Sequence, residues 1–518
     1  MALPFLTLKS TPLLLLIILG QLHGHHAICP DHVITTDGWF PDVWGAVPAN
    51  YNCILEYEIP AGYIVRFTLI PTAPYEDVKN VTFVVDAQHK TKLFSKFNPF
   101  SYIFSTAETA ALHIHTGNQS VNLWIKYNFI DIRNYTRKLV NAGTAQKLNF
   151  PTGSYLTFMA MDPRENGKLR VSSGSLSPET NPTQDFYVFD GESLDSPCLG
   201  TLADMENKKI DSGNLEDDLD NNATYLSLVH FVEKLKLDGV YAIANTEKSL
   251  ESFNNYSLLV SAKGTLQHRS ISFSNATAVT VILHGGNVNY LDELNFISGN
   301  GTVEVFPMAP FHQNSDDLER RERWQRPLLI YDSSTYNKTQ MRSQQIPTSL
   351  FTIVVKKAKV SFNINNKNGE WKWVEQRAGK QFIIFSPSLW NSTATSEFHH
   401  KFYTYTWATR LEAKDVGWNV TVISMNITQT EQFFGTVIGA PHEQPTKATV
   451  KCRDELSTCS EGFEGPLVSS GEGRELTVNF TGKDWPSFAV IQVDTFEVED
   501  RSWFLKMFIY TIRFHWLL

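Results

Sequence analysis

The chain of 518 residues lacks the motifs that would place it among common enzymes or nucleic-acid-binding proteins. It contains no Gly-x-Ser-x-Gly, no His-Glu-x-x-His and no glycine-rich phosphate-binding loop. It also has no basic stretch long enough to indicate nucleic-acid binding, and its net charge is -9. We therefore expect a protein that is not an enzyme, has no catalytic residues of these classes and has no nucleic-acid partner.

One class of enzyme is not excluded by missing motifs. Glycoside hydrolysis needs only two carboxylates, and these have no fixed spacing in a sequence. Asp and Glu are abundant here, but none lies in a setting that distinguishes it from the others. A secreted hydrolase with an unrecognised carboxylate pair is therefore kept as the second alternative.

Cysteine is scarce, with five residues in the whole chain. In an oxidising compartment the natural disulfides join Cys29 to Cys53 and Cys452 to Cys459. Cys198 is then left over. It is either buried and inert, joined to a second chain, or part of a different pairing.

Long apolar runs are scarce as well. Residues 11–22 hold a short apolar core behind Lys9, and Gly24 and Ala27 offer cleavage points after it. A run of this length is typical of a signal peptide and too short to span a bilayer. We predict that residues 1–27 are a signal peptide and that the mature protein is secreted.

The C-terminal segment 499–518 is apolar but also short. Lys506, Arg513 and His515 interrupt it, which is unfavourable for a membrane span. An interfacial or core-docking helix is an alternative. The sequence leaves open whether the tail from Ser502 to Leu518 contacts a membrane, and an association with the cell surface stays an alternative to free secretion.

Acceptor motifs for N-glycosylation are frequent. Twelve Asn-x-Ser/Thr triplets occur, roughly twice the number that chance would give for this asparagine content. Such an excess indicates exposure to the glycosylation machinery. The predicted glycosylation sites are Asn80, Asn118, Asn134, Asn222, Asn255, Asn275, Asn300, Asn337, Asn391, Asn419, Asn426 and Asn479.

The organisation of the chain is predicted from its strand patterns. After the leader about 490 residues remain, which favours three or more domains. Alternating apolar and polar residues, bounded by turn residues, indicate antiparallel strands in an all-β fold. We place the modules at 28–133, 143–285 and 331–498, with a charged connector at 286–330.

The first module carries a specific pattern. Pro48, Asn50, Tyr51 and Cys53 form Pro-x-Asn-Tyr-x-Cys, and Ile-Pro-Ala-Gly follows at 59–62. This pattern resembles the CUB-like domain family of nematode secreted proteins. The resemblance implies antiparallel β-sandwich modules of the jelly-roll type, about three in tandem, and an extracellular role in innate immune responses to microbes.

Two later segments resemble parts of CUB domains in general, which makes the second and third modules CUB-like as well. The matching positions in the second module are Val188, Asp190, Gly191, Ser193, Ser196, Leu199 and Gly200. The matching positions in the third module are Ser469, Ser470, Gly471, Leu476, Val478, Phe480 and Phe488.

The resemblance also raises the question of calcium, which many CUB domains bind close to this Asp-Gly turn. The usual pattern has an Asp six positions before Asp190, where this chain has Gln184. Asp185 lies one residue further on, and a shift of one residue along a strand points the side chain to the opposite face. We therefore predict no cofactor and no metal, with calcium at Asp185 and Asp190 as the alternative.

A histidine pair and several tryptophans near turns are further candidates for binding sites. His113 and His115 share a face of a predicted strand, but no third metal ligand is evident, which favours exposed histidines. Trp39 and Trp44 lie near turn residues. Trp371 and Trp373 share a face if Gly-Glu-Trp-Lys-Trp-Val is a strand, so they are the predicted ligand-binding pair for sugars.

Together these observations predict a secreted, N-glycosylated, CUB-like recognition protein in the innate immune response to microbes. Its expected partners are microbial surfaces, glycan ligands or host extracellular proteins. The first alternative is a carbohydrate-binding or matrix adhesion protein without a defence role.

Overall fold

The computed structural model describes a large part of the chain, in two compact units. Unit 1 comprises Met1–Val140, Phe150–Met159 and Thr183–Leu235, and unit 2 comprises Asn141–Asn149, Ala160–Pro182 and Lys236–Leu518. The described residues are 28–42, 46–71, 82–86, 91–93, 101–118, 120–160, 169–176, 182–205, 225–232, 238–272, 276–310, 327–336, 343–374, 379–385, 398–403, 416–426, 433–438, 446–450, 467–473, 475–480 and 488–497.

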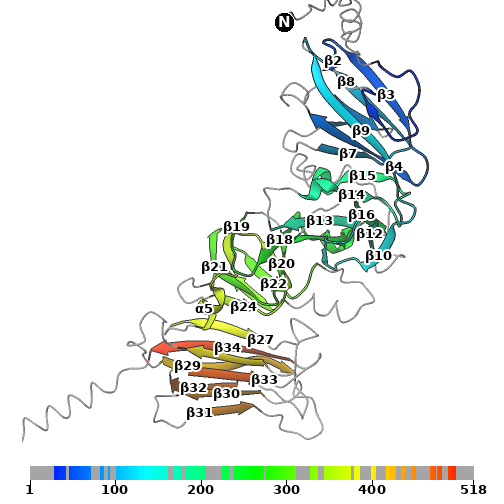
Figure 1. Cartoon of the computed structure of the whole chain (residues 1–518). Helices are drawn as coiled ribbons and strands as arrows, with labels where there is room; N and C mark the ends of the chain where they lie inside the picture. The colour runs from blue at the N-terminus through cyan, green and yellow to red at the C-terminus, as the bar shows by residue number, and fades with distance from the viewer. Residues whose placement is uncertain are drawn as a thin grey trace, which may run out of the picture. The chain divides into compact units, whose positions relative to one another are not determined.

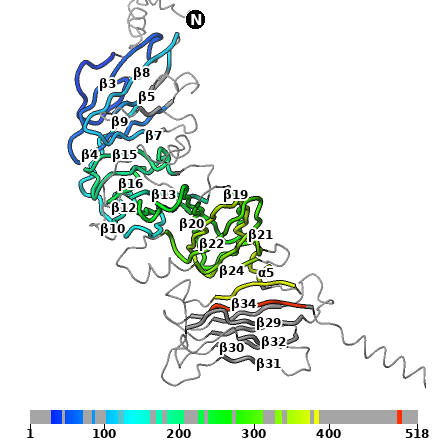
Figure 2. The backbone as a smooth tube through the Cα atoms, turned by 180° about the vertical axis from the view of Figure 1, so that it is seen from behind, coloured from blue at the N-terminus to red at the C-terminus, as the bar shows by residue number. Residues whose placement is uncertain are grey.

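Unit 1 begins with two antiparallel sheets, drawn from blue to cyan in Figures 1 and 2. Sheet A has the strand order β3 (Asn52–Glu58), β8 (Thr109–His115), β5 (Thr82–Asp86) and β6 (Thr91–Leu93). Sheet B has the order β1 (Gly38–Phe40), β9 (Val121–Asp131), β4 (Tyr63–Pro71) and β7 (Ser101–Ser105), and β2 (Ala46–Val47) also pairs with β9.

Alternation along each strand decides which side chains fill the space between sheets A and B. Strand β3 alternates between exposed and buried residues, which places Cys53, Leu55 and Tyr57 inside. The Tyr57 ring meets Phe67 of β4 edge to face, with 4.9 Å between ring centroids. The disulfide between Cys29 and Cys53 is confirmed, and it ties the start of the described chain to β3.

Sheet C completes the description of unit 1. Its order is β10 (Thr136–Asn141), β12 (Ser154–Met159), β16 (Tyr225–His230), β14 (Phe186–Phe189) and β15 (Cys198–Thr201). A 3-10 helix, η4 (Pro182–Asp185), leads into β14. Cys198 is buried in β15, and its Sγ lies 4.0 Å from the carbonyl oxygen of Gly200.

Sheets B and C share an apolar core. The Phe104 ring of β7 meets Tyr187 of β14 edge to face, with centroids 5.8 Å apart. The backbone N–H of Phe104 also donates to the Tyr187 hydroxyl at 3.3 Å. Ile64, Val229 and Phe231 are buried in the same cluster, so one part of the outer face of sheet B is covered within unit 1.

Unit 2 contains three sheets before residue 366. Sheet D has the order β11 (Gln146–Lys147), β17 (Val240–Thr246) and β13 (Leu169–Ser175), and helix α3 (Glu247–Leu250) follows β17. Sheet E has the order β18 (Asn255–Ala262), β20 (Ala276–His284), β25 (Leu350–Lys356), β22 (Thr302–Phe306) and β23 (Leu329–Asp332). Sheet F has the order β19 (Leu266–Ser272), β26 (Lys359–Asn365), β21 (Asn289–Ser298) and β24 (Gln344–Ile346).

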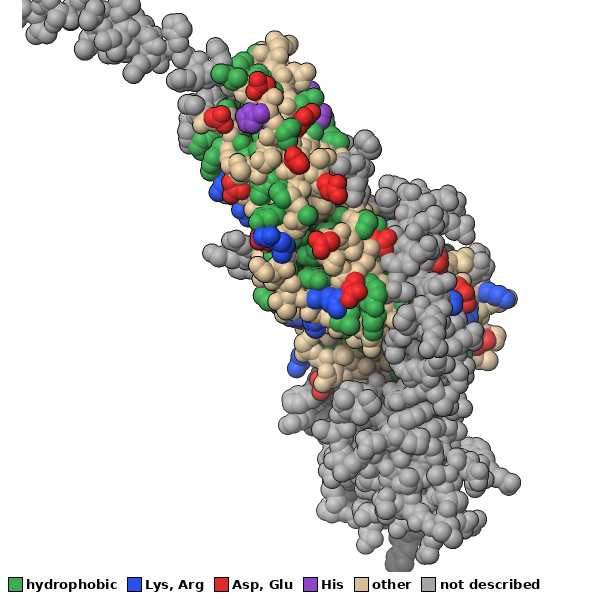
Figure 3. Space-filling view, turned by 90° about the vertical axis from the view of Figure 1, so that its right-hand side faces the viewer, with side chains coloured by type: hydrophobic (Ala, Val, Ile, Leu, Met, Phe, Trp, Pro, Cys, Tyr) green, Lys and Arg blue, Asp and Glu red, His purple; other side chains and the backbone are tan. Residues whose placement is uncertain are grey.

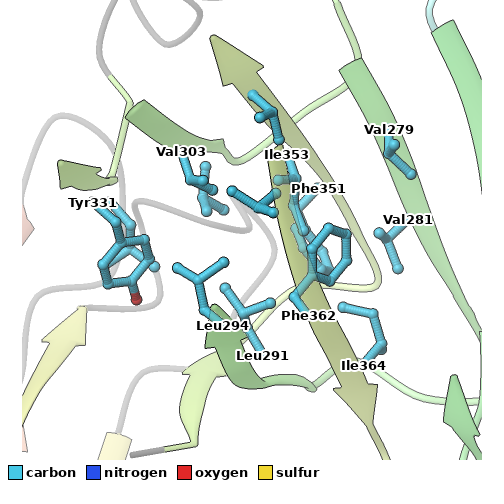
Figure 4. Packing of buried hydrophobic residues seen from close by; sticks show 14 of the residues in the cluster. Val279, Val281, Leu291, Leu294, Val303, Tyr331, Phe351, Ile353, Phe362 and Ile364 are labelled. Atoms are coloured by element: carbon cyan, nitrogen blue, oxygen red, sulfur yellow. The ribbon is translucent and has the colours of Figure 1, made fainter. Parts of the chain in front are cut away.

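Sheets E and F enclose one apolar core. Figure 4 shows Val281 and Phe351 of sheet E together with Phe362 and Ile364 of sheet F in this core. Each of these four side chains is fully buried, as expected of alternating residues between two packed sheets. The pairing of β18 with β20 is parallel, whereas the other strand pairs in sheets E and F are antiparallel.

The last described part of unit 2 forms two antiparallel sheets after helix α5 (Gly369–Val374). Sheet G has the order β27 (Gln381–Phe385), β34 (Phe488–Glu497), β29 (Val416–Asn426) and β32 (Leu467–Gly473). Sheet H has the order β28 (Phe398–Tyr403), β33 (Glu475–Phe480), β30 (Phe433–Ile438) and β31 (Thr446–Val450).

The predicted all-β fold of sandwich modules is confirmed, while the grouping of the strands differs from the expected boundaries. Strands β21 and β22 occupy the first part of the segment 286–330, where a charged connector was expected. They pair with β25 and β26, which lie in the expected third module. Strand patterns in a sequence identify strands but do not say which strands pair, so the division into domains stays a prediction.

Several predicted features lie outside the described residues. These are the leader 1–27, the tail 499–518, and the second predicted disulfide, Cys452 with Cys459. In the part of the chain that the structure describes, no helix has the length and apolar character needed to cross a membrane.

Removing the disulfide of the first module tests its contribution to stability. The double substitution Cys29→Ala and Cys53→Ala should lower the free energy of unfolding of this module by about 3 kcal/mol, because the bond closes a loop between residues 24 positions apart in the unfolded chain. Differential scanning calorimetry of the full chain measures the shift. A reducing agent should produce the same shift in the unfolding transition of this module in the wild type and none in that transition of the variant, and an unshifted variant would contradict the prediction.

Candidate recognition surface

The outer face of sheet B carries the most distinctive group of exposed side chains in unit 1. On β4, Val65 and Phe67 point into the core between sheets A and B. Arg66 between them therefore points to the outer face, because successive side chains of a strand alternate. Arg66 is half-buried there.

Two tryptophans and a lysine lie together on this face. Trp39 of β1 is paired directly with Lys126 of β9, and Trp124 lies two residues from Lys126 on the same strand. The rings of Trp39 and Trp124 have centroids 5.0 Å apart. The Lys126 Nζ lies 5.1 Å from the centroid of Trp39, within the range of a cation–π interaction.

A second cation–aromatic pair lies on the neighbouring strands. The guanidinium carbon of Arg66 is 5.9 Å from the ring centroid of Tyr102 on β7. Its Nη2 donates to Oδ1 of Asn128 at 3.4 Å, and Nδ2 of Asn128 donates to Oδ2 of Asp37 at 2.9 Å. The backbone N–H of Phe129 donates to Oδ1 of Asp37 at 2.7 Å, which anchors this chain of contacts to β9.

We call this group the aromatic face. Its members are Trp39, Trp124, Lys126, Arg66 and Tyr102. Trp39 is 37% exposed and Tyr102 is 41% exposed, so ring surface is open to a partner. Flat rings beside fixed cations can stack on sugar rings or on a peptide side chain and can attract anionic groups.

Sequence reasoning found only one member of the aromatic face. Trp39 was identified as a tryptophan near a turn, and the structure places it in β1 and exposes it. Trp124, Tyr102 and the two cations lie on strands that are far apart in the sequence. Their position on one face follows from strand register, which the sequence does not contain. Trp44 lies outside the described residues.

The predicted sugar-binding pair requires a correction. Gly369–Val374 forms the helix α5 and not a strand, so residues two apart point in different directions. Trp371 is 41% exposed, whereas Trp373 is 1% exposed and meets Phe382 edge to face at 5.1 Å. The two rings therefore do not form a shared exposed surface.

The calcium alternative was tested on the donors present. Asp190 ends β14 at the predicted turn, and Asp185 belongs to η4. Burial raises the pKa of both carboxyls in the metal-free chain. Among the described residues, no three His, Cys, Asp or Glu side chains gather in a way that could hold a metal ion. The described residues therefore do not supply the further ligands that a calcium site at Asp185 and Asp190 needs, and the absence of a metal stays a prediction.

His113 and His115 do share the outer face of sheet A, as predicted. Their ring centroids are 6.2 Å apart, and both are half-buried. The Phe83 ring of β5 stacks on His113 at 4.7 Å with an interplanar angle of 7°. Burial is the main cause that lowers the pKa of His113, and the neighbouring His115 lowers it further. The contact with the Phe83 ring gives His113 a role in packing between β5 and β8.

The predicted glycosylation sites fall into three groups. Asn118, Asn134, Asn255 and Asn300 are exposed. Asn419 and Asn426 lie in β29, and Asn479 lies in β33. Asn80, Asn222, Asn275, Asn337 and Asn391 lie outside the described residues. Exposure at the first group is what attachment of a glycan requires.

Comparison with known proteins identifies the first module. A CUB-like domain model matches residues 27–133, the range that contains sheets A and B. No curated protein matches the chain. The CUB-like domain indicates an extracellular recognition or binding protein.

Three of the solved structures that match have low similarity. The CUB1-EGF-CUB2 domains of rat MASP-1 have 7% identity and a TM-score of 0.16, with 64% of this chain and 100% of that chain covered. The same region of human MASP-1/3 has 7% identity and a TM-score of 0.16, covering 64% and 99%. The full extracellular region of zebrafish Gpr126/Adgrg6 has 11% identity and a TM-score of 0.18, covering 66% and 54%.

Calcium should have no effect on stability. Since a ligand that binds only the folded state raises its melting temperature, excess calcium and excess chelator should give the same thermal unfolding curve. Differential scanning calorimetry of the purified chain makes this comparison. A higher melting temperature in calcium would contradict this prediction and favour the alternative of a site at Asp185 and Asp190.

The buried carboxyl of Asp185 gives a dependence on pH. Burial raises its pKa above the ordinary value of 3.8, and His230 opposes this shift. The stability it contributes is therefore present below pH 3.8 and lost as the pH rises through the folded-state pKa. Asp185→Asn should unfold at a higher temperature than the wild type at neutral pH and not below pH 3.8. A shift of equal size at both pH values would contradict this cause.

Proposed function

We propose that this chain is a secreted, N-glycosylated recognition protein that acts in the innate immune response to microbes and is not an enzyme. Its aromatic face would contact glycans on microbial surfaces. The observation that carries this proposal is the exposed ring of Trp39, which packs on the half-buried Trp124 and has Lys126 beside it. Host extracellular proteins are the alternative partners of the same face.

The chemistry of the aromatic face supports a glycan ligand. The ring of Trp39 offers a flat apolar surface against which a sugar ring can pack. Lys126 and Arg66 are held in place by cation–π contacts and by the hydrogen bond to Asn128, so little side-chain freedom is lost on binding. The two cations would favour anionic surface polysaccharides over neutral ones.

The described residues on the face shown in Figure 3 do not form the extended basic surface of a nucleic-acid-binding protein. Figure 3 shows Lys, Arg, Asp and Glu side chains interspersed on the face in view, without a large area of one sign. Nucleic-acid binding depends on extended basic surfaces. The net charge of -9 supports the same conclusion.

Secretion and glycosylation are supported by two independent features. The disulfide between Cys29 and Cys53 is typical of proteins that pass through an oxidising compartment. The predicted glycosylation sites at Asn118, Asn134, Asn255 and Asn300 are exposed. An adhesion protein without a defence role, or a secreted hydrolase with a carboxylate pair, would share both features and must be distinguished by experiment.

Retention on intact bacteria tests the proposed function. The purified full chain should be retained on the cells, and Trp39→Ala should lower its apparent affinity roughly ten-fold, as expected for an exposed aromatic anchor. Trp371→Ala is the matched control, because Trp371 is as exposed as Trp39 but lies on α5. The binding curves are measured with and without chelator, after calorimetry has shown that both variants fold.

Each outcome separates the alternatives. Absence of retention by the wild type would contradict microbial recognition and favour host partners. Loss of binding in Trp371→Ala but not in Trp39→Ala would contradict a role of the aromatic face and show that the binding surface includes α5. Release of shortened glycans from the cells, abolished by one Asp or Glu substitution, would support the hydrolase instead.

A further inference from the structure

A pocket of about 600 Å³ lies in unit 2, apart from the aromatic face. It is bounded by the loop 143–145 before β11, by Tyr241 of β17, by the turn 285–287 after β20, and by Ser349 and Leu350 at the start of β25. Its walls thus come from sheets D and E. Its volume lies within the range of about 300–1,000 Å³ that is usual for small-molecule sites.

The walls of the pocket are held by main-chain contacts. The Gly143 N–H donates to the carbonyl of Ala244 at 2.6 Å, and the Leu283 N–H donates to the carbonyl of Ser349 at 2.7 Å. Ile282 is buried in the core shared by sheets D and E, and Leu350 packs against that core. The pocket is therefore formed before a ligand enters, which reduces the entropy lost on binding.

Gly285 and Gly286 form the turn that bounds one side of the pocket. A Cβ built on Gly286 would lie 2.8 Å from Cδ2 of Leu283, so a larger residue here would need the end of the Leu283 side chain to move. Its neighbour Gly285 has a φ of +72°, a conformation that favours glycine. The backbone conformation explains the glycine at 285.

The hydroxyl of Tyr241 is oriented by a chain of polar side chains. It lies 3.0 Å from Nδ1 of His284, and Nε2 of His284 lies 3.4 Å from Oδ1 of Asp238. Lys147 Nζ donates to the same Asp238 oxygen at 2.9 Å. The hydrogen bond from Lys147 lowers the pKa of Asp238, so this carboxylate is charged at neutral pH.

The charged Asp238 lies on the Nε2 side of the His284 ring, 3.4 Å from that nitrogen. It favours the tautomer of His284 that carries its proton on Nε2, which leaves Nδ1 as an acceptor. Tyr241 then donates its own proton to Nδ1, and burial raises the Tyr241 pKa, which keeps that proton in place. The phenolic oxygen is left with lone pairs that can accept a hydroxyl proton from a ligand.

The other described residues that line the pocket define the class of ligand. None of them carries a formal charge, and Thr144, Asn287 and Ser349 are exposed at its rim. They offer neutral donors and acceptors, while Ile282 and Leu350 offer apolar surface. A ligand with several hydroxyl groups, an apolar ring face and no charge matches this lining.

We propose that this pocket binds an uncharged sugar residue of a glycan, with the Tyr241 oxygen accepting a sugar hydroxyl and the rim residues contacting the others. The site is distinct from the aromatic face and does not depend on the function proposed for it. His284 and Asp238 are positioning residues, since they act on the ligand through Tyr241.

The test uses the full chain and immobilised oligosaccharides. The probes end in mannose, glucose, galactose or N-acetylglucosamine, and sialylated versions of the same chains provide the charged comparison. The wild type should bind at least one neutral probe more tightly than its sialylated version. Tyr241→Phe should weaken this binding roughly three- to ten-fold, since one hydrogen bond is lost. Tyr241→Ala should weaken it further.

Two controls make the result specific. Tyr155→Phe removes the hydroxyl of another half-buried tyrosine, in unit 1, and should leave binding unchanged. Trp39→Ala should also leave binding to the neutral probes unchanged, so failure of this proposal and failure of the proposed function are distinguishable. If Tyr241→Ala does not fold, Asn287→Ala at the exposed rim takes its place and should weaken binding.

The proposal would be overturned by three results. The first is a wild type that binds none of the neutral probes. The second is a wild type that binds only sialylated probes. The third is unchanged binding in two folded variants, Tyr241→Phe and Tyr241→Ala. If Tyr241→Ala does not fold, unchanged binding in Tyr241→Phe and Asn287→Ala counts instead.

Discussion

The packing of one sheet face against another decides which residues of this protein are available for recognition. Sheets A and B bury alternate residues of each strand in one core, and sheets E and F do the same in another. Each strand then presents its remaining residues on the opposite face, because side chains alternate along a strand. What those outer residues contact determines whether they serve stability or binding.

The outer face of sheet B serves both purposes. Phe104 and Tyr102 lie two residues apart on β7 and therefore point to the same side of the sheet. Phe104 is 3% exposed because it packs against Tyr187 of sheet C, whereas Tyr102 is 41% exposed. Sheet C thus covers one part of the face and leaves the part with Trp39 open. A substitution in the open part removes little buried surface and costs little stability.

Much of the fold was predictable from the sequence, for a local reason. The alternation in Asn52–Glu58 is visible in the amino-acid sequence, and the structure shows the same alternation as burial. The pairing of Cys29 with Cys53 followed from their spacing and from the inferred compartment. These features depend on residues that are close in the sequence.

The features that were missed depend on residues that are far apart. Register places Trp39 beside Lys126, and the chain between them gives no sign of that contact. The pocket needs Tyr241 to meet His284, which lies on a strand of another sheet. Gly369–Val374 was misread because Trp-Lys-Trp fits a strand pattern as well as a short helix. Burial of Trp373 against Phe382 resolves this ambiguity only in the folded chain.

The two proposed surfaces differ in their chemistry, and this difference has a consequence for recognition. Lys126 and Arg66 give the aromatic face positive charge, so salt should weaken its binding to an anionic polymer. The pocket is lined by uncharged described residues, so its binding should depend little on salt. Each surface alone offers few contacts and would bind a single sugar weakly. The salt dependence of binding therefore distinguishes a contact through the aromatic face from a contact through the pocket.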